Sequence, residues 1–161
     1  MWAAGACRVL TEVLYRDTVH RDMELQKDMG GEPTGTRQRA RKGRLLIVDD
    51  EPQIGNTLRL LLHPDHEVVP VTSARAGLSL IKTDGQFDII FCDLMMPVIS
   101  GRDFYRELEA IAPHMLERLV FMTGGVFSIQ TNEFLDSVPN TCIEKPFDIG
   151  SLLALINERV R

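Results

Sequence analysis

Several short apolar runs in this sequence are each followed at once by side chains that can bind cations or anions. These side chains are Asp49, Asp50 and Glu51 after Val48, Asp93 after Cys92, Thr123 after Met122, and Glu144 and Lys145 after Ile143. Together they offer carboxylates, a hydroxyl and an ammonium group. If the runs are parallel strands, their carboxyl ends meet at one edge of a sheet, so these groups should lie close together.

Aspartates packed this closely raise the cost of one another's ionisation, and a cation is needed to offset the repulsion. Asp49, Asp50 and Asp93 supply the hard oxygen ligands that Mg²⁺ prefers, and Mg²⁺ leaves positions for phosphate oxygens. Lys145 adds a charge that can meet a phosphate, and the Thr123 hydroxyl can donate to one of its oxygens. Because phosphoryl transfer depends mainly on positioning and charge neutralisation, these residues predict a Mg²⁺-dependent phosphoryl-transfer site.

The elements that would position these residues alternate along the chain between short apolar runs and amphipathic segments. The runs are residues 45–48, 68–71, 89–92, 119–122 and 141–143. Each is too short for a helix and is almost wholly apolar, which is typical of strands buried on both faces. Pro70 cannot donate a ladder hydrogen bond, which favours a place near the sheet edge for the second run.

The segments between the runs carry apolar residues at helical spacing. The stripes are Ile54, Leu58, Leu61 and Leu62; Ala74, Leu78 and Ile81; Phe104, Leu108 and Ile111; residues 129–135; and Leu152, Leu153, Ile156 and Val160. Asp148 is placed to cap the last segment. This strict alternation predicts an α/β fold of the (βα)5 type, a doubly wound parallel five-stranded sheet with helices on both faces.

The first 43 residues differ from the rest of the chain. Residues 30–36 (GGEPTGT) are turn-forming, and residues 37–44 are rich in arginine and lysine. An interrupted apolar stripe from Val9 to Leu14 allows only a short helix before them. We therefore interpret residues 1–43 as an N-terminal extension and basic linker, partly helical or disordered, and residues 44–161 as a single domain.

Composition excludes several classes of function. Residues 44–161 carry seventeen Asp or Glu and ten Lys or Arg, an acidic balance that argues against direct DNA binding. No apolar run has the roughly 18–20 residues of a membrane span, and the N-terminus lacks a signal-peptide pattern, so we expect a cytoplasmic location. The three cysteines are widely spaced, which favours reduced thiols, with Cys92 and Cys142 buried as small hydrophobes.

Four segments together resemble the signature segments of bacterial response-regulator receiver domains. They are residues 45–52 (LLIVDDEP), residues 88–97 (DIIFCDLMMP) with Gly101, Thr123, and residues 144–147 (EKPF). Each segment alone is weak, but all four occur in the family's order, at the ends of predicted strands one, three, four and five. The resemblance covers about residues 43–161 and implies the flavodoxin-like receiver fold.

The resemblance also implies roles for individual residues. Asp93 would be the phosphoacceptor in a two-component phosphorelay, taking the phosphoryl group from a phosphohistidine on a histidine kinase or phosphotransfer protein. Asp50 and Asp93, with the backbone carbonyl of Met95, would bind Mg²⁺, and Asp49 would contribute through water. Lys145 would neutralise the acyl phosphate.

Transmission of the signal is implied by the same resemblance. Thr123 would move toward the phosphoryl group and change affinity for a downstream protein partner, and Pro146 is similar to the family's proline after a cis peptide bond. The Thr123-Gly124-Gly125 sequence and Phe134-Leu135 are similar to receivers at the C-terminus of hybrid sensor kinases. No DNA-binding helix pair follows residue 161, so we expect output through another protein or another part of a longer chain.

The sequence departs from the family pattern at two places. Many receivers have an aromatic residue three positions before the lysine, whereas this chain has Cys142, so signalling by rotation of that ring is not expected. Gly124 and Gly125 leave little side-chain cover beside the site. We therefore expect a short-lived phosphorylated state unless Met95 covers it.

Two alternatives remain open from sequence. An aspartyl nucleophile, Mg²⁺ and a lysine on a parallel sheet also describe phosphatases of the haloacid dehalogenase type, but these need an acid/base aspartate two residues after the nucleophile, where this chain has Met95, and their cap insertions are absent. An inert receiver-like binding module would keep the fold without turnover. The preferred interpretation is a signalling receiver rather than an enzyme, one that assists its own phosphorylation and dephosphorylation.

Overall fold

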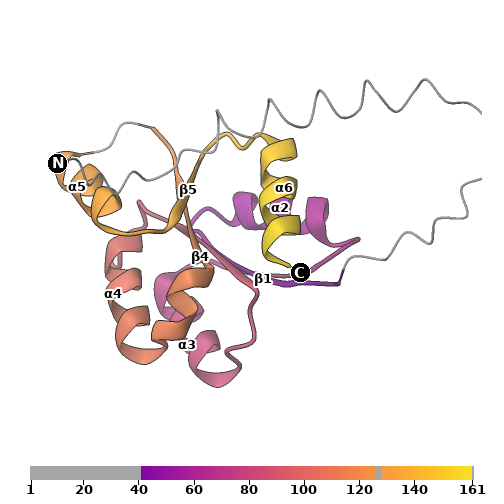
Figure 1. The fold of residues 1–161 in the computed structure, drawn as a ribbon, viewed down its shortest axis with the longest axis horizontal. Helices are drawn as coiled ribbons and strands as arrows, with labels where there is room; N and C mark the ends of the chain where they lie inside the picture. Colours follow the sequence, from indigo (N-terminus) through magenta and orange to yellow (C-terminus); the bar gives the residue numbers. More distant parts are fainter. Residues whose placement is uncertain (1–40, 126–127, 161) are drawn as a thin grey trace, which may run out of the picture.

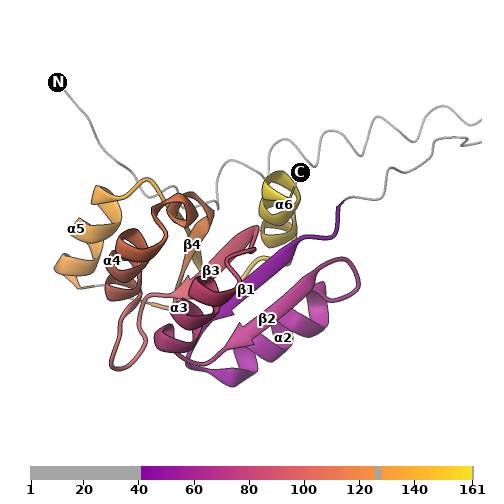
Figure 2. The ribbon, with the colours of Figure 1, turned by 90° about the horizontal axis from the view of Figure 1, so that it is seen from below.

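A five-stranded parallel sheet forms the centre of the computed structural model, which describes residues 41–125 and 128–160. In chain order the elements are β1 (Arg44–Val48), α2 (Pro52–Leu62), β2 (Glu67–Val71), α3 (Ala74–Thr83), β3 (Ile89–Asp93), α4 (Gly101–Ile111), the 3₁₀ helix η1 (Pro113–Arg118), β4 (Leu119–Thr123), α5 (Ile129–Ser137), β5 (Thr141–Glu144) and α6 (Ile149–Arg159). The strand order is β2-β1-β3-β4-β5, with β2 at one edge (Figure 2).

The predicted (βα)5 fold is confirmed, and so is the edge position of Pro70. The predicted short helix and turn-rich linker before residue 41 lie outside the described residues.

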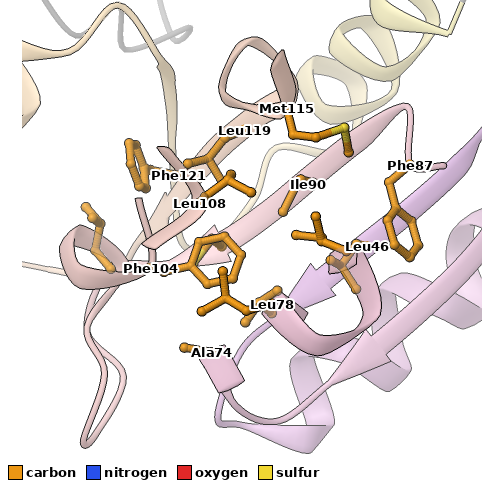
Figure 3. Close-up of a cluster of buried hydrophobic side chains, with 14 of the residues drawn as sticks. Leu46, Ala74, Leu78, Phe87, Ile90, Phe104, Leu108, Met115, Leu119 and Phe121 are labelled. Atoms are coloured by element: carbon orange, nitrogen blue, oxygen red, sulfur yellow. The ribbon is translucent and has the colours of Figure 1, made fainter. Parts of the chain in front are cut away.

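Helices cover both faces of the sheet because alternate strand side chains point to opposite sides. Helices α3, α4 and α5 pack on one face, around a core that includes Phe104, Leu108 and Phe121 (Figures 1 and 3). Helices α2 and α6 pack on the other face, against residues such as Ile47 and Phe91. No helix within the described ranges has the length and apolar character needed to cross a membrane.

The strands extend slightly beyond the apolar runs that predicted them. Asp93, Thr123 and Glu144 are the last residues of β3, β4 and β5, where the sequence pattern placed them just after the strands. The difference arises because backbone pairing continues for one residue past the last apolar side chain. These functional candidates are therefore fixed by the sheet itself.

Short polar side chains begin four of the helices. Ser73, Ser100, Ser128 and Asp148 each accept a hydrogen bond from a backbone N–H in the first turn of α3, α4, α5 and α6. The cap at Asp148 was predicted. The 3₁₀ helix η1 was not, because its sequence has no regular apolar stripe.

Two arginines of the basic run at residues 37–44, one at the end of the predicted linker and one at the start of the predicted domain, bind acidic side chains. Arg41 forms an ion pair with Asp88, and Arg44 pairs with Glu67 and Asp84 at the amino end of the sheet. The ion pair with Asp88 joins Arg41, at the end of the predicted linker, to the domain. The acidic partners come from distant parts of the chain and have no local signal in the sequence.

Gly101 connects the fold to the site, because it lies against the backbone that follows Asp93. A Cβ atom at this position would lie 2.6 Å from the carbonyl oxygen of Asp93 and 2.8 Å from the Cα of Leu94. The Gly101 N–H also donates to the Leu94 carbonyl over 3.1 Å. The first turn of α4 therefore sets the position of the loop after β3.

We predict that Gly101→Ala lowers the free energy of unfolding by about 1–3 kcal/mol, since a methyl group is forced against backbone that cannot move without displacing Asp93. Urea unfolding followed by circular dichroism measures this change. Gly150→Ala, in the exposed first turn of α6, is the matched control, because its nearest neighbour would be an aspartate oxygen at 3.4 Å. Equal stability of the two variants would contradict the proposed steric role of Gly101.

Candidate functional site

Three aspartates meet at the carboxyl edge of the sheet. Asp49 and Asp50 follow β1, and Asp93 ends the neighbouring strand β3, where Val48 pairs in register with Cys92. Each of the three offers a carboxylate oxygen, and these oxygens all lie within 4.8 Å of one another. Asp49 and Asp93 are only 2% and 5% exposed, whereas Asp50 is half-buried. The structure thus places together the three carboxylates that the sequence pattern predicted to be neighbours.

Lys145 is the cation that meets this cluster. Its Nζ lies 2.7 Å from Asp49 Oδ2 and 3.0 Å from Asp93 Oδ1. Burial alone would lower the pKa of Lys145, but hydrogen bonds to the two aspartates outweigh it, and the pKa is raised above its ordinary value. The lysine therefore stays charged between the carboxylates.

Backbone N–H groups bind the remaining oxygens of the same two aspartates. The Met95 N–H donates to Asp93 Oδ2 over 3.2 Å, and the Glu51 N–H donates to Asp49 Oδ1 over 3.0 Å. Despite these contacts, burial raises the pKa of Asp93, with hydrogen bonding to Lys145 opposing it and the nearby Asp49 adding to it. The sequence contains no signal for such backbone donors, so they were not predicted.

Thr123 lies at the end of β4 with its side chain buried at 2% exposure. Its hydroxyl donates a long hydrogen bond of 3.5 Å to the Ile143 carbonyl, and its own carbonyl accepts from the Lys145 N–H. Strands β4 and β5 therefore hold Thr123 and Lys145 next to each other. The long hydroxyl contact leaves this donor easy to redirect.

The other residues that the sequence pattern singled out lie outside the carboxylate cluster. Glu51 and Glu144 are exposed, and neither belongs to the carboxylate cluster. Met95 has its side chain 64% exposed at the mouth of the site. The peptide bond before Pro146 is cis, as the resemblance implied.

The predicted burial of two thiols is confirmed, since Cys92 and Cys142 are both buried. Burial raises the pKa of Cys92 well above its ordinary value, and the charges of Asp93 and Asp49 add to this. A neutral thiol behind the acidic cluster acts as a small apolar residue. We assign Cys92 no part in the chemistry.

The donor set fits a hard divalent cation. Carboxylate oxygens from two neighbouring strand ends lie within 4.8 Å of one another, a spacing at which they could hold one ion. Mg²⁺ is bound in proteins by one or two carboxylates together with waters and phosphate oxygens, and this edge offers such carboxylates beside a lysine. Asp49, Asp50 and Asp93 are the residues that would hold it.

A doubly wound parallel sheet with an acidic cluster and a lysine at its carboxyl edge is the architecture of the receiver class. The model of the response regulator receiver domain family matches residues 45–157, and the chain belongs to this family of two-component signalling domains. A solved receiver domain protein from Clostridium thermocellum is 29% identical over 73% of this chain and 94% of its own, with a TM-score of 0.63. A receiver protein from Pseudomonas putida, at 23% identity and a TM-score of 0.65, covers 74% of this chain and 98% of its own and supports the fold alone.

Curated relatives extend beyond the region that is matched. An uncharacterized transcriptional regulatory protein of Bacillus subtilis, YkoG, is 30% identical over 122 residues, 74% of this chain and 52% of the relative. The response regulator ArlR of Staphylococcus saprophyticus is 29% identical over 119 residues, 73% and 52% of the two chains. This chain therefore spans about half the length of the curated relatives it matches. The resemblance to receivers of hybrid kinases stays a prediction.

We predict that millimolar Mg²⁺ raises the melting temperature of the protein, because a cation that binds only the folded state offsets the repulsion among the three aspartates. Asp50→Asn should remove most of the increase while leaving the ion pairs of Lys145 in place. Asp136→Asn, which removes an exposed charge on α5 outside the cluster, is the control and should keep it. Differential scanning fluorimetry with MgCl₂, against NaCl at matched ionic strength, measures the effect; the same rise in all three proteins would contradict a site at this edge.

Proposed function

We propose that this chain is the phosphoacceptor receiver of a two-component phosphorelay, in which Asp93 takes a phosphoryl group from a phosphohistidine on a histidine kinase or phosphotransfer protein. One observation carries the proposal: the Lys145 ammonium group lies within 3.0 Å of both Asp49 and Asp93 at the end of β3. An ammonium group in this position is available to the oxygens of a phosphoryl group on Asp93.

The chemistry follows from the charges at the site. An Asp93 carboxylate oxygen forms the new bond to phosphorus while the bond between phosphorus and the imidazole nitrogen of the donor breaks. Lys145 neutralises charge on the phosphoryl oxygens, and the Thr123 hydroxyl turns from Ile143 to donate to one of them. Asp49, Asp50, Asp93 and the Met95 carbonyl would hold Mg²⁺, which would supply further charge neutralisation.

The domain passes its output to a downstream protein partner, whose affinity changes when Thr123 moves. The domain itself makes no direct contact with DNA. We place the domain in the cytoplasm, where histidine kinases present their phosphohistidine. An aspartyl-phosphate phosphatase of the haloacid dehalogenase type is less well supported, because the thioether of Met95 cannot exchange a proton where that mechanism requires a carboxylate.

We predict that incubation with acetyl phosphate and Mg²⁺ adds one phosphoryl group to the protein, seen by intact mass, and that Asp93→Asn abolishes the addition. Lys145→Met should slow labelling by about a hundredfold, as loss of one charge-stabilising donor typically does. Arg106→Met, which removes an exposed cation on α4, is the matched control and should label at the wild-type rate. Labelling that persists in Asp93→Asn would contradict the assignment, and rapid turnover of unrelated phosphate esters would favour the phosphatase.

We also predict that Gly124→Val lengthens the half-life of the phosphorylated protein at least about twofold, because it reduces access of water to the acyl phosphate. A Cβ at Gly124 would lie 3.7 Å from the Lys145 side chain, an ordinary contact. Gly125 is less suitable because its φ of +100° strains any other residue. Loss of the label with time is followed by mass, and an unchanged half-life would show that the open space at Gly124 does not control hydrolysis.

A further inference from the structure

Helix α5 is anchored to the domain more lightly than its neighbours. Leu135 is its one buried residue, whereas α3 buries four residues and α4 buries three. Ile129, at the start of α5, is 77% exposed. Elements with few buried apolar contacts open and shift most easily, so α5 is the helix on this face that can move at least cost.

A cluster of three aromatic rings supplies much of the remaining contact. The Phe134 ring of α5 lies edge-on to the Phe121 ring of β4 and to the Tyr105 ring of α4, with both pairs of ring centroids 5.6 Å apart. Tyr105 and Phe121 are themselves 6.3 Å apart. We call these three residues the ring cluster. Figure 3 shows Phe121 at the end of the buried core remote from Phe87.

The position of Cys142 explains why Phe134 can occupy this place. Phe121 pairs in register with Cys142 on β5, so the strand next to the ring cluster presents a small side chain. A large residue at position 142 would compete with Phe134 for the space beside Phe121. The ring that packs here therefore comes from α5 instead of from β5.

A hollow of about 180 Å³ joins α5 to the loop that follows Asp93. It is lined by Leu94, Met95, Ser100, Arg102, Gln130, Thr131 and Phe134. Phe134 thus borders the ring cluster and also the hollow. Because Met95 donates its N–H to Asp93, a change at Asp93 reaches the wall of the hollow within two residues.

The ring cluster also has a link to Thr123. Phe121 lies two residues before Thr123 on β4, so the two side chains point to the same face of the sheet. Turning of the Thr123 hydroxyl toward a phosphoryl group would thus take place on the face of β4 that also carries Phe121. Phe134 therefore packs against the strand that carries Thr123 and also lines the hollow beside Met95.

We propose that Phe134 is the positioning residue through which phosphorylation of Asp93 moves helix α5: its ring leaves the ring cluster and enters the hollow beside Met95. This inference rests on the proposed function, because it requires an acyl phosphate or its analogue at Asp93. It assigns to a residue of α5 the coupling that Cys142 has no ring to provide. Phe134 itself touches neither Asp93 nor the phosphoryl group and acts by holding α5 in one of two positions.

The test is hydrogen–deuterium exchange on the full chain with Mg²⁺, with and without beryllofluoride as a stable acyl-phosphate analogue. In the wild type we expect peptides from α5 to change their exchange rate about 5- to 150-fold, the range of ordinary allosteric coupling, while peptides from α3 stay unchanged. Phe134→Leu, which keeps apolar bulk but removes the ring, should abolish the response of α5. Phe134→Tyr, which restores the ring, should recover it.

Two further variants separate coupling from stability. Thr131→Leu fills part of the hollow and leaves the ring cluster intact, so it should reduce the response. Leu80→Ala removes a partly buried contact with the same core on α3 and should leave the response intact. A full response in Phe134→Leu, or an unchanged α5 in wild-type protein that has bound beryllofluoride, would overturn the inference. Failure to bind beryllofluoride, together with failure to label with acetyl phosphate, would instead overturn the proposed function and this inference with it.

Discussion

The contact between the Lys145 ammonium group and the carboxylates of Asp49 and Asp93 is the interaction on which the site depends. Both aspartates are almost fully buried, and without a cation their charges would repel each other in a medium that screens poorly. Lys145 offsets this repulsion only in part, since burial still raises the pKa of Asp93. Buried ion pairs contribute little net stability, so this one is better explained by chemistry than by folding. Because Lys145 balances only part of the negative charge, the carboxylate cluster favours binding of a further cation and reaction with an electrophilic phosphoryl group.

The sheet makes such an arrangement possible because it is covered on both faces. The central strands β3 and β4 are buried along their whole length, so the edge that carries Asp93 and Thr123 has little freedom to relax. Parallel pairing places the ends of β1, β3, β4 and β5 at one edge. Gly101 then brings the start of α4 against the backbone of Asp93, closer than any other residue would permit. The repulsive charges are held together by packing that lies elsewhere in the molecule.

Local patterns in the sequence predicted the features that local physics determines. The apolar runs predicted the strands, and Pro70 predicted that β2 lies at the edge of the sheet. Asp148 was predicted to cap the last helix, and it does so. The carboxylate cluster was also predictable, because strand ends in a parallel sheet converge. Partners brought together by tertiary structure were not predictable: the ion pair between Arg41 and Asp88 and the packing of the Phe134 ring against Tyr105 join segments that are distant in the sequence. A single sequence carries no signal for pairs that only the folded chain defines.

The two tasks of a receiver make opposite demands on packing, and under the proposed function different elements of this molecule meet them. A phosphoryl-transfer site needs groups held within fractions of an ångström, which requires buried strands and a tightly packed first turn of α4. A signalling element needs two positions that differ little in free energy, which requires few buried contacts. Helix α5 meets the second demand, with one buried residue and a ring shared with its neighbours. Under the proposed function, a small residue at Cys142 is compatible with the chemistry, because the ion pair between Lys145 and Asp93 requires no ring from β5.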